Sequence, residues 1–314
     1  MKWHYQCTPG DEWDYDAIQH LLLADIRINN RNRKVIMQAN KNGYFYVIDR
    51  TNGEFISASE MSQVSWATGI DPKTGRPNVH PDALYSEEKG TTVYPVQMHN
   101  TSQMSFNPNT GLVYVPIAVE NTFSFVAAKS YTPTPGSQNF GLNLGGARGG
   151  TPMASPPPHG PDRKNPDGSK VRGGILTAWD PATQKERWFS LGGGQTGGGA
   201  LSLASNLVIQ TLSNGRMKAF TADKGESLLD MALPLNAGVG PPMTFMLDGK
   251  QYIALMGGNG AAGRGGAGRG APPAAGAAPA EPTAAAAQRG NDVPPAPAAA
   301  GANNPKLLVY AVPN

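Results

Sequence analysis

Acidic residues crowd the segment Asp11–Asp16, where Asp14 and Asp16 are separated by a single tyrosine. Side chains in an extended segment alternate between its two faces, so burial of Tyr15 would turn both aspartates to the opposite side together. Such a pair can bind a hard cation, or one carboxylate can act as a base beside a metal ion held by the other. The spacing therefore predicts a metal site, an acid-base site or both.

A solvated loop is the alternative interpretation, because most acidic clusters in turns have no chemical role. An EF-hand is excluded, since the loop lacks the glycine and the later glutamate of that geometry. The Gly-x-Gly-x-x-Gly matches at 192–197 and 258–263 do not open a helix in a βαβ unit. The histidines have no metal-ligand spacing, and no Gly-x-Ser-x-Gly elbow supports a serine hydrolase.

A recurring turn signature punctuates the chain. Asp or Asn begins the turn and caps it, and the glycine that usually ends it supplies positive φ. The signature occurs at Asp49–Gly53, Asp71–Gly75, Asn107–Gly111, Asp180–Gln184 and, in a shorter form, Asp223–Gly225. Runs of β-branched and aromatic residues predict strands at 44–48, 112–117, 176–179, 207–212, 217–220 and 252–255. Short strands at regular turn spacing are typical of a β-propeller.

The composition favours the same fold class. The 314 residues include 39 Gly and 28 Pro, and 39% are hydrophobic, which indicates a loop-rich all-β protein. A formal net charge of +3 is small for this length, so no nucleic-acid partner is implied. No apolar run approaches the roughly 18 residues of a membrane span. The single cysteine, Cys7, excludes an intramolecular disulfide.

Two segments stand apart in composition. Residues 145–174 are rich in Gly, Pro and charge and predict a surface insert. Residues 257–304 are almost entirely Gly, Ala, Pro and Arg, and this composition predicts a disordered insertion. Residues 305–314 contain an apolar run that predicts a final strand. The expected organisation is a partial propeller over 1–256, the insertion, and a last strand that returns to the propeller.

Several longer motifs follow one another along the chain: Lys2–Gln6, Thr8–Asp16, Leu21–Ile26, Asn40–Arg50, Trp66–Asp71, His99-Asn100 with Met104–Pro108, and Gly249–Tyr252. In this order they resemble the pyrroloquinoline quinone (PQQ) dependent alcohol dehydrogenases of the methanol/ethanol family. The resemblance implies an all-β propeller of the eight-bladed quinoprotein type, with about half of the blades in this chain. It also implies that Trp188, which closes the unit begun at Ala178, docks a blade on its neighbour.

The resemblance assigns roles to particular residues. Asp14 matches the catalytic base, which takes the alcohol proton while hydride passes to PQQ. Lys41 matches the cation that hydrogen-bonds the quinone oxygens, and Asn100 matches a side chain at the cofactor's edge. Asp14 and Asp16 are the expected metal ligands. Asp16 matches the extra aspartate of members that use a lanthanide(III), so the expected metal is a lanthanide rather than Ca²⁺. The implied reaction is the oxidation of primary alcohols, with other alcohols and aldehydes left open as substrates.

The resemblance also sets expectations about location and partners. The family is periplasmic, although this chain shows no signal peptide, and Lys2–Gln6 reads as the end of a repeat. The chain is therefore expected to begin in mid-domain and to be inactive alone. No Cys-x-x-Cys-His is present, so electrons are expected to pass to a separate acceptor such as a cytochrome c.

Two departures from the family pattern accompany the match. Thr101 follows His-Asn where the family usually has tryptophan, and Thr196–Gly199 replaces a typical Trp-Asn-Gly-Gly. The family's other metal ligands, a glutamate and an asparagine, belong to the half of the propeller that precedes this chain.

The rival interpretation is a non-catalytic propeller scaffold that binds protein partners. Such a scaffold has no need of Asp14, Lys41 and Asn100 together.

Overall fold

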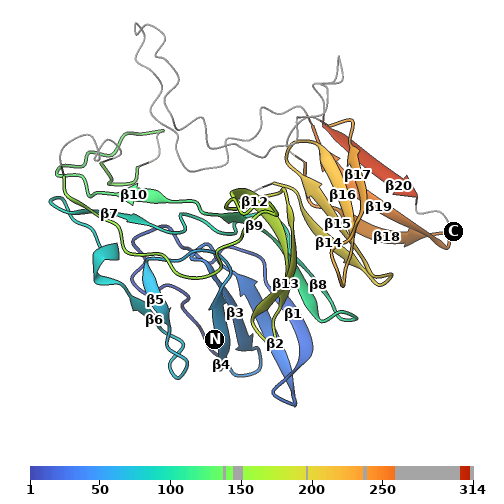
Figure 1. Cartoon of the computed structure of the whole chain (residues 1–314), viewed down its shortest axis with the longest axis horizontal. Coiled ribbons are helices and arrows are strands. Elements are labelled where there is room, and N and C mark those ends of the chain that lie inside the picture. Colours follow the sequence, from blue (N-terminus) through green and yellow to red (C-terminus); the bar gives the residue numbers. More distant parts are fainter. Residues whose placement is uncertain (137–138, 144–150, 196, 236–238, 259–304, 312–314) are drawn as a thin grey trace, which may run out of the picture. The chain divides into compact units, whose positions relative to one another are not determined.

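The computed structural model describes residues 1–136, 139–143, 151–195, 197–235, 239–258 and 305–311, and nearly all of their regular secondary structure is β-strand (Figure 1). Over these residues the only helical element is η1, the short 3-10 turn Pro81–Ala83. None of the described helical structure has the length and hydropathy to cross a membrane. The all-β prediction is confirmed.

The chain divides into two compact units. The first comprises Met1–Ala17, Ala39–Met98 and Val119–Val171, and the second comprises Ile18–Gln38, His99–Ala118 and Arg172–Asn314. The strands of the first unit are β3 (Tyr44–Asp49), β4 (Phe55–Glu60), β5 (Ala67–Ile70), β6 (Pro77–Val79), β7 (Gly90–Val93), β10 (Phe123–Phe125) and β11 (Met153–Ala154). β3 pairs with β4 and β5 with β6, whereas β7 lies between antiparallel β10 and parallel β11.

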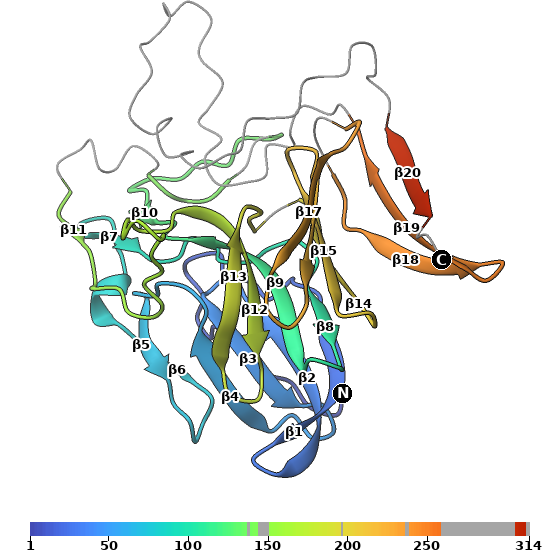
Figure 2. The ribbon, with the colours of Figure 1, turned by 45° about the vertical axis from the view of Figure 1, so that its right-hand side comes forward.

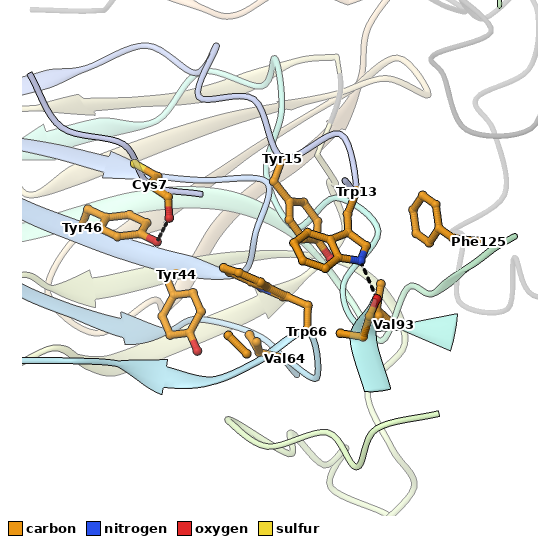
Figure 3. Close-up of a cluster of buried hydrophobic side chains, with 11 residues drawn as sticks. Cys7, Trp13, Tyr15, Tyr44, Tyr46, Val64, Trp66, Val93 and Phe125 are labelled. Carbon is orange, nitrogen blue, oxygen red and sulfur yellow. Dashed lines mark hydrogen bonds between the residues drawn. The ribbon is translucent and has the colours of Figure 1, made fainter. Parts of the chain in front are cut away.

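An aromatic cluster forms the core of the first unit (Figure 3). Tyr44 and Tyr46 of β3 contribute to it, because every second residue of a strand faces the same side. Trp66 lies at its centre, and its Nε1 donates to the Asn42 carbonyl at 2.8 Å. Cys7 packs here as a small buried side chain, and burial raises the pKa of its thiol to about 12. The cluster thus ties the N-terminal segment to β3.

The described part of the predicted surface insert is anchored to the link between β4 and β5. His159 and Val64 exchange two backbone hydrogen bonds of 2.9 and 2.8 Å. The Arg163 guanidinium, almost fully buried, donates to the Met61 carbonyl at 2.9 Å. Residues 145–150 of this insert lie outside the described residues, as do most of the predicted 257–304 insertion, residues 259–304.

The second unit carries the longer sheets. Its strands are β1 (Leu22–Ile28), β2 (Arg31–Ala39), β8 (Ser105–Asn107), β9 (Leu112–Val119), β12 (Gly173–Asp180), β13 (Lys185–Leu191), β14 (Gly199–Leu203), β15 (Leu207–Leu212), β16 (Arg216–Thr221), β17 (Ser227–Ala232), β18 (Met243–Leu247), β19 (Lys250–Gly257) and β20 (Lys306–Ala311). β1 pairs with β2. The orders β13-β12-β9-β8 and β14-β15-β16-β17 are four-stranded sheets of the size of a propeller blade.

Every strand predicted from the sequence is present. The last of them, β20, pairs antiparallel with β19, and Figures 1 and 2 show the two strands side by side. It therefore returns to the sheet from the far end of the sequence. The third sheet of this unit has the order β18-β19-β20.

Three of the predicted turns hold an aromatic ring against the glycine that ends them: Trp3 on Gly53, Phe55 on Gly75 and Trp188 on Gly225. The N–H of Gly53 donates to the Asp49 carbonyl at 2.8 Å, and Gly225 donates likewise to Thr221. The last turn therefore begins at Thr221, two residues before the predicted Asp223. A Cβ on Gly225 would lie 2.5 Å from the Trp188 ring. Trp188 Nε1 also donates to the Ala222 carbonyl at 3.0 Å, so β13 docks on the turn of the next sheet as predicted.

Replacing Gly225 by alanine is expected to destabilise the protein by about 2–4 kcal/mol, because the methyl group adds a ring clash to the cost of positive φ. Gly249 is the matched control, since both glycines have a φ of 73° and a Cβ on Gly249 would meet nothing within 4 Å. Gly249→Ala is expected to cost only about 1 kcal/mol. Urea denaturation measures both values, and equal losses would contradict the ring-docking role.

Candidate functional site

Two buried aromatic side chains fix the acidic segment. Trp13 and Tyr15 are each 1% exposed. Trp13 Nε1 donates to the Ala83 carbonyl at 2.9 Å, and the Tyr15 hydroxyl donates to the Pro95 carbonyl at 2.5 Å. Both rings lie against Trp66, with ring centroids 5.4 Å apart in each pair (Figure 3). The residue between these two anchors is Asp14, so its position is set by the core.

The carboxylates of Asp14 and Asp16 meet at one buried cation, the ammonium of Lys41. Lys41 Nζ lies 3.3 Å from Asp14 Oδ2 and donates to Asp16 Oδ1. The side chains of Asp14 and Asp16 are 69% and 45% exposed, whereas that of Lys41 is 5% exposed. Both aspartates therefore point away from buried Tyr15. Asp14 achieves this with a left-handed φ of 65°, and not through the extended backbone from which the arrangement was expected.

The turn that carries Lys41 is held by asparagine side chains. Asn42 N–H donates to Asn40 Oδ1 at 3.1 Å, and Asn42 Nδ2 donates to the Tyr46 hydroxyl at 2.9 Å. Asn42 is fully buried, so this network fixes the direction in which Lys41 leaves the turn. Asn42 was not among the predicted site residues, although its place beside Lys41 in the Asn40–Arg50 motif was a usable signal.

The titration of Asp14 is shifted upward. Partial burial raises the pKa of this carboxyl, the positive charge of Lys41 opposes the rise, and the negative charge of Asp16 adds to it. Gln97, which is buried, places Nε2 at 3.3 Å from Asp14 Oδ2. This amide donates to the carboxylate and orients it without adding a charge to the site. No sequence pattern around Gln97 indicated this contact.

The two carboxylates fit part of a hard-cation site. Each offers two oxygens, whereas Ca²⁺ takes roughly six to eight oxygen ligands. Across the described ranges, no group of three or more His, Cys, Asp or Glu side chains is placed to hold a metal ion. Asp14 and Asp16 can therefore be two ligands of an ion whose other ligands come from elsewhere.

Asn100 belongs to the second unit, whereas Asp14, Asp16 and Lys41 belong to the first. Its side chain is half-buried. Its backbone N–H donates to the Gln195 carbonyl at 3.0 Å. The structure thus brings Asp14, Asp16 and Lys41 together in the first unit. Asn100 is held by contacts within the second unit.

The residue before Asn100 is a buried histidine. His99 has no exposed surface, and its Nδ1 lies 2.8 Å from the Pro116 carbonyl. A carbonyl only accepts, so the neutral ring carries its proton on Nδ1. Burial lowers the pKa of His99 to about 4. The folded protein therefore holds His99 neutral.

The stability of the protein is expected to fall as the pH drops from about 6.5 to about 4 because the unfolded chain protonates His99 first. The loss from this group reaches about 3 kcal/mol at the lower end. His99→Asn keeps a donor for Pro116 but does not titrate. Denaturation at a series of pH values gives the difference between the two proteins, and a difference that does not change with pH would rule out this contribution.

The chain is similar in sequence to known proteins. Residues 1–74 match the family described as glucose/ethanol/alcohol dehydrogenase, beta-propeller domain. Quinohemoprotein alcohol dehydrogenase ADH IIB of Pseudomonas putida is 40% identical over 265 residues, which is 82% of this chain and 35% of that protein. The 1-butanol dehydrogenase (cytochrome c) of Thauera butanivorans is 38% identical, over 81% of this chain and 35% of that protein. The chain thus spans about a third of the length of these relatives.

The chain is also similar to solved structures. The quinohemoprotein alcohol dehydrogenase from Comamonas testosteroni superposes with a TM-score of 0.66 and 38% identity, over 81% of this chain and 36% of that one. A europium-containing methanol dehydrogenase gives a TM-score of 0.64 at 25% identity, over 81% of this chain and 42% of that one. The predicted propeller of the quinoprotein type is confirmed. The chain belongs to the PQQ-dependent alcohol dehydrogenases, as part of their β-propeller domain.

Proposed function

We propose that the protein oxidises primary alcohols by hydride transfer to PQQ in the presence of a bound metal ion, and that this chain supplies the catalytic base. The observation that carries the proposal is the meeting of Asp14 and Asp16 at the buried ammonium of Lys41. Burying an ammonium costs free energy, so a solvated acidic loop without a chemical role is not expected to have a buried lysine beside its carboxylates. The alcohol dehydrogenase names of the relatives support the same reaction.

Bound PQQ with its metal ion would supply a polarised quinone carbonyl that accepts hydride from the alcohol carbon. Asp14 takes the hydroxyl proton. Its carboxylate is open to solvent, and an ionised aspartate within reach of the alcohol can accept its proton. Lys41 and Gln97 both contact Oδ2, so we assign Oδ1 to the substrate proton.

Lys41 is the group we assign to the quinone oxygens. Its ammonium has three donors, and its contacts with Asp14 and Asp16 use two of them. The remaining N–H is available to an oxygen of the cofactor. Asn100 is proposed to lie at the cofactor's edge.

Asp14 and Asp16 are the proposed metal ligands, and a lanthanide(III) is the proposed metal rather than Ca²⁺. A trivalent ion gains more from each anionic oxygen than a divalent ion does, and Asp16 supplies a second carboxylate. The likeness to a europium-containing methanol dehydrogenase supports this choice. We place the protein in the periplasm, with a cytochrome c as electron acceptor, in keeping with the name of the 1-butanol dehydrogenase relative.

The test is dye reduction by the protein as its gene encodes it, supplied with a primary alcohol, PQQ, and either Ca²⁺ or a lanthanide. Reduction that requires alcohol, PQQ and metal supports the proposal, and the isolated 314-residue chain is expected to be silent. Absence of reduction with either metal would favour the alternative, a non-catalytic propeller scaffold that binds protein partners.

A further inference from the structure

A glycine-rich segment, described over residues 192–195 and 197–199, supports the Asn100 region of the second unit. Its Gln195 carbonyl accepts three successive backbone N–H groups, those of Asn100, Thr101 and Ser102, at 3.0, 2.9 and 3.3 Å. Convergence of three donors on one oxygen fixes the backbone direction at Asn100. The position of that carbonyl therefore decides how Asn100 is presented.

Ser102 holds the carbonyl of Gln195 in place. This serine is fully buried, and its hydroxyl lies 2.8 Å from the Gly194 carbonyl and 3.1 Å from the Gly197 carbonyl. These carbonyls stand on either side of Gln195 in the sequence. One side chain thus clamps the segment whose carbonyl receives the N–H groups of Asn100–Ser102.

On its other side the segment lies so close to β15 that only glycine fits at position 198. A Cβ on Gly198 would lie 2.1 Å from the Thr211 carbonyl oxygen, and its N–H donates to the Val239 carbonyl at 2.6 Å. Gln210, also buried, donates to the Gly192 carbonyl at 3.2 Å. Residues 192–195 and 197–199 are thereby held from both sides and can support Asn100.

We propose that Ser102 is a positioning residue for Asn100, acting through the Gln195 carbonyl, and so contributes to PQQ binding without touching the cofactor. The inference rests on the proposed function, because it takes Asn100 to lie at the cofactor's edge. The Gly-x-Gly-x-x-Gly match at 192–197 then has a structural use that involves no dinucleotide.

The test compares Ser102→Ala with Ser105→Ala in the protein as its gene encodes it, loaded with metal. Ser105 is the matched control, because its hydroxyl is buried and has no hydrogen-bond partner in the described structure. Titration with PQQ, followed by fluorescence quenching, is expected to give about tenfold weaker binding for Ser102→Ala and unchanged binding for Ser105→Ala. Hydrogen exchange at the Asn100 and Thr101 amides is expected to accelerate only in Ser102→Ala.

Asn100→Ala completes the test as a double-mutant cycle. If Ser102 acts through Asn100, Ser102→Ala costs no further PQQ affinity in the Asn100→Ala background. An equal cost in both backgrounds, or unchanged amide exchange in Ser102→Ala, would overturn the positioning role. Failure of the unaltered protein to bind PQQ would instead overturn the proposed function and with it any role toward the cofactor, while the exchange data would still report the clamp.

Discussion

Replacing Asp14 by asparagine is expected to lower kcat for alcohol oxidation by about 1,000-fold at saturating metal and PQQ. Asparagine has nearly the same shape and can still accept a hydrogen bond from Lys41, which lies 3.3 Å from Oδ2, but it cannot take a proton. The core contacts of Trp13 and Tyr15 are unaffected, so the fold should remain intact. Dye reduction with a primary alcohol measures the loss.

Glu12→Gln is the matched control for Asp14→Asn. Glu12 is an exposed acid two residues away, and its backbone carbonyl, not its side chain, accepts a hydrogen bond from Tyr85. Its loss should change kcat by less than about twofold, since exposed surface substitutions have small effects. Asp14 is also a proposed metal ligand, so the metal affinity of Asp14→Asn is measured by titration. Lost turnover at saturating metal then reports the loss of the base. Near-normal turnover in Asp14→Asn would mean that another group removes the alcohol proton.

Local sequence patterns predicted seven of the described strands and placed four of the five turns correctly. The run 207–212 is β15 without any shift of its ends, because a short run rich in β-branched residues and bounded by turn residues leaves few other conformations. The docking of Trp188 was expected from the resemblance to the PQQ-dependent alcohol dehydrogenases, in which such a tryptophan packs one blade on the next. The ring sits on Gly225, whose identity as its partner required the neighbouring sheet.

Contacts between distant segments were beyond the sequence. Gln97 and Asp14 are separated by 83 positions, and nothing local to either one indicates the other. The positive φ of Asp14 is equally hidden, since it results from anchoring Trp13 and Tyr15 in one core. The support that residues 192–199 give to Asn100 depends on a carbonyl of Gln195, and a backbone group leaves no residue pattern to read. Sequence reasoning could therefore name Asp14, Asp16 and Lys41 but not the groups that orient them.

Replacing Asp16 by alanine is expected to abolish lanthanide-supported activity and to weaken lanthanide binding by about 100-fold or more. Attraction between an ion and a carboxylate scales with the ion's charge, so a trivalent ion loses half as much again as Ca²⁺ does. Lys41 also loses one of its two carboxylate partners and turns more fully to Asp14, which leaves less negative charge for the metal. Titration with a lanthanide and with Ca²⁺ measures the loss of metal affinity, and dye reduction measures the loss of activity.

Asp82→Asn is the control for Asp16→Ala, because Asp82 is an exposed aspartate of the same unit that pairs with Lys89 at 2.8 Å. It should bind and use a lanthanide as the unaltered protein does. The discriminating quantity is the ratio of lanthanide to Ca²⁺ affinity, which falls in Asp16→Ala if Asp16 is a ligand. Unchanged lanthanide activity in Asp16→Ala would contradict that assignment. Asp16 would then serve only to neutralise the buried Lys41, and the preference for a trivalent ion would have to come from ligands outside the Asp11–Asp16 segment.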